Sequence, residues 1–229
     1  EFCNNLGRTE ADIRAKGFTT GDLFASELKD VNITYTCFDR ECDLGKTKAD
    51  SGTYRLRTLL PAGCANPFIK ATKQGYLPEE SVLRGNRLDL TLTKLKPMKV
   101  KVKIHPYYAP AKQWLAPREL GKKETLFLRA ELKNNTFEQI KEYPLDDTLE
   151  FAEKDSAYEV NFVLTLGTSQ IGGYTNDNLQ VSYSDIADKE EAVLNIVEYR
   201  PNPTTNEQKG QMIGFLHEEN YEQVKPEFK

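Results

Sequence analysis

The chain has 229 residues, of which 38% are apolar, 29% charged and 10% aromatic. An aromatic share this high excludes a disordered chain, and the length exceeds one typical domain of about 100–150 residues. The formal charge is only −4, and no basic stripe carries interleaved aromatic residues, which argues against a nucleic-acid-binding protein. We therefore expect two small folded domains with hydrophilic surfaces.

Membrane attachment is expected only through segments outside this chain. The apolar runs are far shorter than the roughly 20 residues needed to span a bilayer. The chain starts at Glu1 without a methionine, which we interpret as a processed or excised piece of a longer protein.

Alternation of apolar and polar residues predicts β-strands in the first hundred residues. The turn sequence Ala49-Asp50-Ser51-Gly52 separates two of them, and a short helix is expected at 9–16. The expected strands are 31–37, 44–48, 53–60 and 88–92.

The same alternation continues through the second half of the chain. Gly172-Gly173 and Asn176-Asp177-Asn178 are expected to form turns, and a helix is expected at 205–220, just after Pro203. The expected strands are 98–104, 126–130, 158–166, 179–183 and 194–196.

Most of these strands have one apolar and one wet face, which is typical of antiparallel sheets. We predict an all-β fold of two tandem antiparallel β-sandwiches, Ig-like or prealbumin-like, with a short C-terminal helix. The proline-bearing segment 94–97 marks the boundary. The predicted domains are therefore 1–96, stapled by disulfides, and 97–229, which ends in the helix and a polar tail.

Four cysteines lie within the first 64 residues and none follows them: Cys3, Cys37, Cys42 and Cys64. Two disulfides and a zinc site both remain open, but only Cys37 and Cys42 have a spacing near that of a zinc knuckle. A hairpin would bring these two within disulfide distance. We therefore predict the pairs Cys37–Cys42 and Cys3–Cys64, in an oxidising extracellular setting.

The segment 30–95 resembles the carboxypeptidase regulatory-like and PEGA group of small β-sandwiches. The motifs that carry the resemblance are VNITYTC (31–37), CDLGKT (42–47), LPAGC (60–64) and IKATKQGY (69–76). The resemblance implies a prealbumin-like seven-stranded fold and a non-enzymatic role as spacer, stalk or binding module of cell-surface proteins. The cysteine-bearing version is similar to modules of archaeal surface proteins, and the disulfides would replace the Lys–Asn isopeptide bond of some bacterial relatives.

Catalytic and metal sites have little support in the sequence. The sequence has no Gly-x-Ser-x-Gly nucleophile elbow that could act with His105 or His217. The segment around His217 also lacks the second histidine of a zinc-protease helix. Adjacent carboxylates on a strand point to opposite faces, so they are interpreted as solvated charges. These pairs are Asp146-Asp147, Glu190-Glu191 and Glu218-Glu219. Calcium at 176–178 stays an alternative, although the spacing of a calcium loop is absent. No enzyme, cofactor or metal site is predicted.

Tyr107, Tyr108 and Trp114 lie in the proline-rich stretch 105–121 and are the candidate binding residues. In the alternative interpretation, Trp114 plugs an edge of the second sandwich. Asn32 and Asn134 begin Asn-x-Thr sequons and are candidate glycosylation sites.

The resulting hypothesis is a non-enzymatic extracellular module, a scaffold or spacer of a larger cell-surface protein that binds other proteins or glycans. The alternative is a carbohydrate-binding accessory module of a secreted enzyme. A hydrolase with an unrecognised site is the least favoured.

Overall fold

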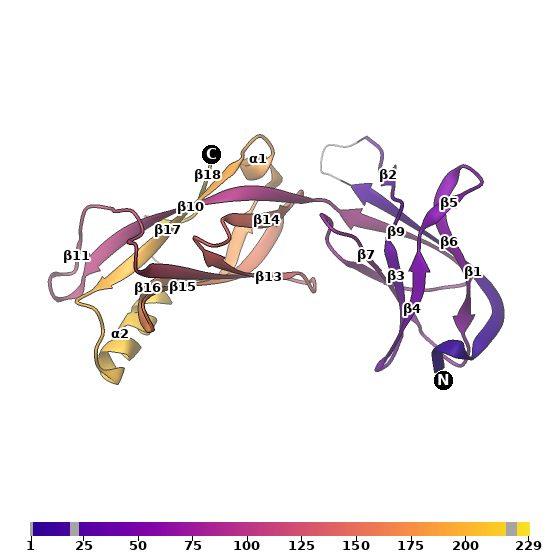
Figure 1. The fold of residues 1–229 in the computed structure, drawn as a ribbon, viewed down its shortest axis with the longest axis horizontal. Helices are drawn as coiled ribbons and strands as arrows, with labels where there is room; N and C mark the ends of the chain where they lie inside the picture. The colour runs from indigo at the N-terminus through magenta and orange to yellow at the C-terminus, as the bar shows by residue number, and fades with distance from the viewer. Residues whose placement is uncertain (1, 19–22, 219–223) are drawn as a thin grey trace. The chain divides into compact units, whose positions relative to one another are not determined.

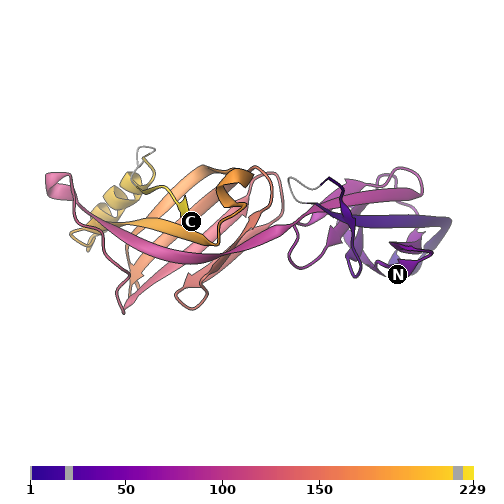
Figure 2. The ribbon, with the colours of Figure 1, turned by 90° about the horizontal axis from the view of Figure 1, so that it is seen from above.

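A computed structural model describes residues 2–18, 23–218 and 224–229. The chain divides into two compact units, drawn as ribbons in Figures 1 and 2. Unit 1 comprises Glu1–Lys96 and Ala152–Lys154, and unit 2 comprises Pro97–Phe151 and Asp155–Lys229.

Unit 1 is built from two sheets whose apolar faces enclose a core. One sheet has the order β2-β1-β6-β5, with β9 also paired to β1, and the other has the order β4-β3-β7-β8. A 3-10 helix, Phe2–Asn4, precedes them. The strands are β1 (Leu6–Phe18), β2 (Ser26–Glu27), β3 (Asn32–Cys37), β4 (Arg40–Lys46), β5 (Lys48–Asp50), β6 (Thr53–Pro61), β7 (Phe68–Thr72), β8 (Glu79–Val82) and β9 (Arg87–Thr93).

The helix expected at 9–16 is wrong, because these residues belong to β1. Ala11, Ile13 and Ala15 are fully buried and alternate with half-buried charged side chains, which is the period of a strand. Two of the three buried residues are alanines, so the apolar alternation is faint in the sequence. Pairing to both β6 and β9 decides the conformation of this segment.

The predicted disulfide pairing is also wrong. The bridges are Cys3–Cys42 and Cys37–Cys64, with Cα–Cα distances of 5.5 and 6.0 Å. In the β3–β4 hairpin, Cys37 lies opposite Arg40 and Cys42 lies opposite Tyr35. The two cysteines are therefore offset along the hairpin rather than facing each other, and each is joined to a segment distant in sequence. All four cysteines form disulfides, so the alternative of a zinc site built from them is excluded.

Unit 2 is built on one sheet that curls round on itself. Its order is β11-β10-β17-β16-β15-β12-β13, with β14 also paired to β10 and β18 to β17. The strands are β10 (Leu95–Tyr108), β11 (Gln113–Trp114), β12 (Glu124–Leu132), β13 (Glu138–Tyr143), β14 (Thr148–Ala152), β15 (Ser156–Leu166), β16 (Ser169–Val181), β17 (Glu191–Arg200) and β18 (Glu227–Phe228).

A buried glutamine closes the ring of strands between β13 and β14. The Gln139 side chain donates to the Glu150 carbonyl at 2.7 Å and accepts from the Glu150 amide at 2.9 Å. It thus replaces a pair of backbone ladder bonds. Since β14 pairs with β10, the apolar faces of all these strands enclose one core.

The core side chains of unit 2 come from the positions that sequence alternation predicted. They include Met98, Val100, Val102, Ile104, Leu126, Leu128, Ala130, Tyr158, Val160, Phe162, Leu164, Leu194 and Ile196. The predicted all-β sandwich class is confirmed. The sheets are mixed rather than purely antiparallel, however, because β1 runs parallel to β9 and β10 runs parallel to β17.

The turns expected at Gly172-Gly173 and at Asn176–Asn178 are wrong, because both segments lie within β16. A Cβ atom on Gly172 would lie 1.9 Å from the Val197 carbonyl oxygen in β17. Glycine is therefore needed here because two backbones approach closely, not because the chain reverses.

Among the described residues of unit 2 are two α-helices, α1 (Tyr183–Ile186) and α2 (Asn206–Leu216). The expected 179–183 strand therefore ends earlier, at Val181. The helix expected at 205–220 is present but ends at Leu216, and residues 219–220 lie outside the described residues. Thr205 and Gln208 form a capping box, each side chain bonding the other's backbone amide.

Candidate binding surface

Aromatic side chains gather where β10, β11 and β17 meet α2. Tyr107 lies opposite Trp114 and Tyr199 on the neighbouring strands, so the three rings share one face of the sheet. Phe215 of α2 stacks on Tyr107 with ring centroids 4.2 Å apart, and Trp114 lies 5.0 Å from Tyr107. We call Tyr107, Trp114, Tyr199 and Phe215 the aromatic cluster.

The aromatic cluster fixes α2 to the sheet. Its four members are half-buried, and Met212 and Leu216 of α2 are buried beside them. Tyr107 and Phe215 are stacked, and the other ring pairs of the cluster are tilted or edge-on, so the rings pack mainly against one another. This arrangement agrees with the alternative in which Trp114 plugs an edge of the sheet.

Tyr108 does not belong to the aromatic cluster. Its partner in β11 is Gln113, and strand alternation points its ring to the opposite face. The side chain is 41% exposed. The structure thus brings together two of the three candidate binding residues and separates the third.

A partly buried ion-pair network lies at the same end of unit 2 and was not predicted from the sequence. Arg118 donates to both oxygens of Glu124 at 2.6 and 2.8 Å, and to Glu198 at 3.0 Å. Arg200 pairs with the other oxygen of Glu198 at 2.9 Å. The four residues are scattered between positions 118 and 200, so only the fold shows that they meet.

This network is poorly suited to acid–base chemistry. Hydrogen bonds from Arg118 hold the pKa of Glu124 below its ordinary value, and the Gly121 amide adds to this, although burial acts in the opposite direction. A general acid needs a pKa near the working pH. Glu124 and Glu198 are both held by the Arg118 guanidinium, and the geometry assigns them a structural role.

The two histidines occupy separate environments. The His105 Nε2 atom lies 2.9 Å from the Asn195 Oδ1 atom. Asn195 is buried and donates to the Lys225 carbonyl at 2.7 Å, which ties the C-terminal segment to β17. His217 is exposed at the C-terminal cap of α2.

The adjacent carboxylates form surface ion pairs rather than a catalytic pair. Asp146 pairs with Lys141 at 2.6 Å, and Glu191 pairs with Lys101 at 2.7 Å. Glu218 is exposed, and Glu219 lies outside the described residues.

The calcium alternative at 176–178 gains no support. These residues line a polar hollow with His217 and Glu218. The Asn176 side chain already donates to the Tyr174 hydroxyl and accepts from the Asn178 amide. Within the described residues, no group of three or more His, Cys, Asp or Glu side chains is arranged to hold a metal ion.

Both sequon asparagines are exposed. Asn32 is the first residue of β3, and Asn134 lies in the turn between β12 and β13 with a φ of +62°. Glycosylation of either residue stays a prediction.

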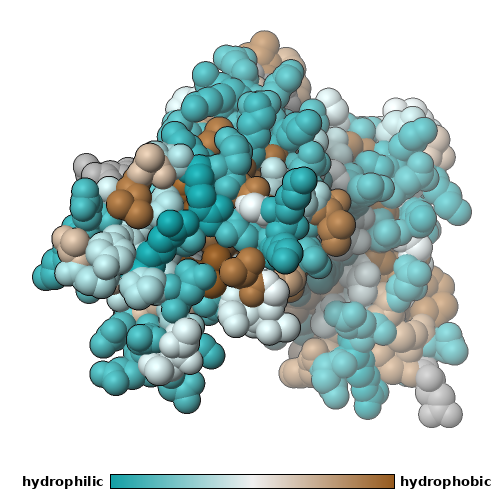
Figure 3. All heavy atoms as spheres, turned by 60° about the vertical axis from the view of Figure 1, so that its left-hand side comes forward, coloured by the Kyte–Doolittle hydropathy of each residue, from teal (hydrophilic) through white to brown (hydrophobic). Residues whose placement is uncertain are grey.

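The surface at the α2 end of unit 2 is mainly hydrophilic. Figure 3 shows its apolar side chains in small separate groups. This face offers no broad apolar area of the kind that marks an obligate interface. Among the described residues, no helix is long and apolar enough to cross a membrane.

Comparisons with known proteins find likeness only among solved structures. No family model and no curated protein matches the chain. The shaft pilin SpaA from Lactobacillus rhamnosus GG, as the D295N mutant, is 11% identical with a TM-score of 0.29, covering 86% of this chain and 99% of its own. A streptococcal ancillary pilin is 10% identical with a TM-score of 0.36, covering 85% and 64%. The Bacillus anthracis TIE protein is 12% identical with a TM-score of 0.26, covering 85% and 34%. At such low identities and TM-scores, function must be argued from the chain's own residues.

Proposed function

We propose that this chain is a non-enzymatic module of an extracellular surface protein, where it acts as a scaffold or spacer and binds other proteins or glycans. The observation that carries the proposal is the pair of disulfides in unit 1. Disulfides persist in oxidising compartments and are rare in the cytosol. The resemblance of 30–95 to carboxypeptidase regulatory-like and PEGA modules, including archaeal ones, supports the same proposal.

The polar side chains of unit 2 support a non-enzymatic role. Glu124 and Glu198 are bound to Arg118, and His105 is bound to Asn195. These three side chains form hydrogen bonds that hold strands together, so none of them is a free base or nucleophile of the kind that catalysis requires.

Labelling of intact cells tests the proposed location. A membrane-impermeant lysine reagent applied to the native cells should label this chain, since many of its lysines are exposed, and a cytosolic protein serves as the control. Labelling of the chain only after lysis would contradict the proposal.

A carbohydrate-binding accessory role is the second candidate, because Tyr108 is exposed within the proline-rich stretch. Exposed rings provide platforms for apolar sugar faces. If this candidate is correct, a glycan array gives a signal that Tyr108→Ala abolishes. Leu145→Ala, a change at another exposed apolar residue of unit 2, should keep the signal. An array with no signal for the unmodified chain would remove this candidate.

A further inference from the structure

Each unit pairs its first long strand with its last long strand in parallel. In unit 2, β10 and β17 are matched over ten residue pairs, from Lys99 opposite Glu191 to Tyr108 opposite Arg200. In unit 1, β1 and β9 are matched over seven pairs, from Asp12 opposite Arg87 to Phe18 opposite Thr93. The two pairs are independent instances of one arrangement.

Strand direction decides how such a pair responds to tension along the chain. Tension reaches unit 2 at the start of β10. After β17 the chain runs on through α2 and β18, and β18 pairs with the start of β17, so tension acts at the end of β17 once these two segments have detached. Because the strands are parallel, these two points lie at opposite ends of the ladder, so the hydrogen bonds are loaded in shear and share the load. If the strands were antiparallel, both points would lie at one end and the bonds would open one after another.

We infer that this chain is a load-bearing spacer, in which the parallel pairs β10–β17 and β1–β9 act as mechanical clamps. The inference rests on the proposed function as a spacer and adds the physical load that the spacer carries. It does not depend on how the two units are placed relative to each other, since each clamp lies within one unit.

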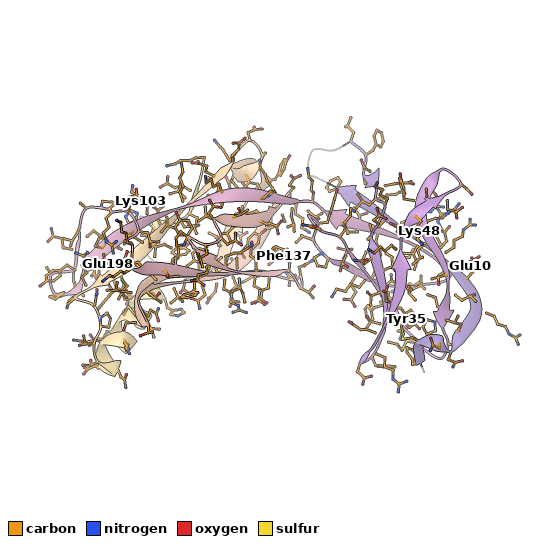
Figure 4. All side chains as sticks on the ribbon, viewed as in Figure 1. Glu10, Tyr35, Lys48, Lys103, Phe137 and Glu198 are labelled. Atoms are coloured by element: carbon orange, nitrogen blue, oxygen red, sulfur yellow. A yellow bond between two sulfur atoms is a disulfide. The ribbon has the colours of Figure 1, made fainter. Side chains whose placement is uncertain are left out.

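Side chains reinforce the clamp of unit 2 along its length. Lys101 pairs with Glu191 at 2.7 Å near the start of β17. The His105 side chain bonds Asn195 in the middle of the ladder. Near its end, the ring centroids of Tyr107 and Tyr199 are 6.3 Å apart. Figure 4 shows Lys103 of β10 and Glu198 of β17 on these neighbouring strands.

The disulfides limit how far unit 1 can extend if its clamp opens. They are interlaced, so the shortest covalent path from Cys3 to Cys64 crosses both bridges and the five residue steps between Cys42 and Cys37. At about 3.5 Å per residue this path spans roughly 30 Å, against about 210 Å for the intervening chain. Most of unit 1 is therefore held within a short length under oxidising conditions.

Single-molecule force spectroscopy on the full chain tests the clamp of unit 2. One sample carries handles at Pro97 and Asn202, which pull β10 from its start and β17 from its end. The matched sample keeps the handle at Pro97 and carries the second handle at Asp188, so both strands are pulled from the same end. All three residues are exposed, and unnatural side chains at these positions leave the four cysteines undisturbed.

The unfolding force through Pro97 and Asn202 should exceed that through Pro97 and Asp188 by roughly twofold or more, because only the first geometry loads the bonds together. Equal forces, or a higher force in the second geometry, would overturn the inference. Both samples have the same fold, so the comparison does not depend on a destabilising variant.

A substitution pair provides a second test. The Lys99 amide donates to Glu190 and the Ile104 amide to Arg118 on the other side, so by alternation the Lys103 amide faces β17. Lys103→Pro should lower the force in the first geometry, whereas Lys103→Ala should preserve it. Similar forces for both variants would count against the clamp. Failure of either test leaves the cell-labelling result intact, so the load-bearing role and the surface location can fail separately.

Discussion

At the scale of single residues, Gln139 determines whether the ring of strands in unit 2 is closed. Gln139 is 7% exposed, and its side chain joins β13 to β14 through one bond to the Glu150 carbonyl and one to the Glu150 amide. We expect Gln139→Leu to lower the free energy of unfolding by about 2–4 kcal/mol, since two buried backbone groups lose their partner. Urea unfolding of the full chain measures this change.

Gln180→Leu is the control for Gln139→Leu. Gln180 is exposed, and its side chain bonds that of the exposed Asn178. Its replacement should change the free energy of unfolding by less than about 0.5 kcal/mol. An equal loss in the two variants would mean that Gln139 does not close the ring.

Glu124 makes the stability of unit 2 depend on pH, and the sign of this dependence follows from the shift of its pKa. Its pKa in the folded chain is lowered, first by hydrogen bonds from Arg118. Stability from this group is therefore present above the unfolded pKa of about 4.3 and is lost as pH falls through the lower folded value. The stability difference between the natural chain and Glu124→Gln should shrink as pH falls from about 6 to below 4. A difference that stays constant over that range would contradict the assignment.

At the scale of elements, two glycines in unit 2 should respond oppositely to alanine. A Cβ at Gly172 would collide with the β17 backbone, whereas a Cβ at Gly210 in α2 would meet no atom within 4 Å. We expect Gly172→Ala to lower the melting temperature strongly and Gly210→Ala to raise stability by about 0.5–1 kcal/mol. Thermal unfolding followed by circular dichroism checks both, and a neutral Gly172→Ala would contradict the close approach of β16 and β17.

Elements with strong local signals could be predicted from the sequence. The alternation at 98–104 gave both the strand and its buried face, and the capping residues Thr205 and Gln208 mark the start of α2. β1 was missed because its inward positions are mostly alanine, so pairing with two neighbours decides its conformation.

Features that depend on strand register could not be predicted. The disulfide pairing follows from the offset of Cys37 and Cys42 in the β3–β4 hairpin, which the spacing of cysteines does not reveal. The Arg118 network and the bond between Gln139 and Glu150 likewise join residues whose approach is set by tertiary structure. Only aromatic composition pointed to the cluster around Trp114, and it did not separate Tyr108 from it.

At the scale of the whole molecule, stabilisation by disulfides is confined to unit 1. The bridges span 39 and 27 residues, and the chain-entropy model gives each about 4 kcal/mol when it is taken alone. We expect reduction to lower the melting temperature of unit 1 and to leave that of unit 2 unchanged. Calorimetry with and without a reducing agent measures this, and one transition that shifts as a whole would contradict independent units.

The central claim is that this chain works in an oxidising, extracellular environment as a disulfide-braced module. Non-reducing peptide mapping of the chain isolated from its native cells, with thiols blocked at lysis, tests it most directly. The structure predicts two linked peptide pairs, Cys3 with Cys42 and Cys37 with Cys64. Four blocked thiols would contradict the extracellular role, and a Cys37–Cys42 bridge would contradict the interlaced connectivity on which the restricted extension of unit 1 depends.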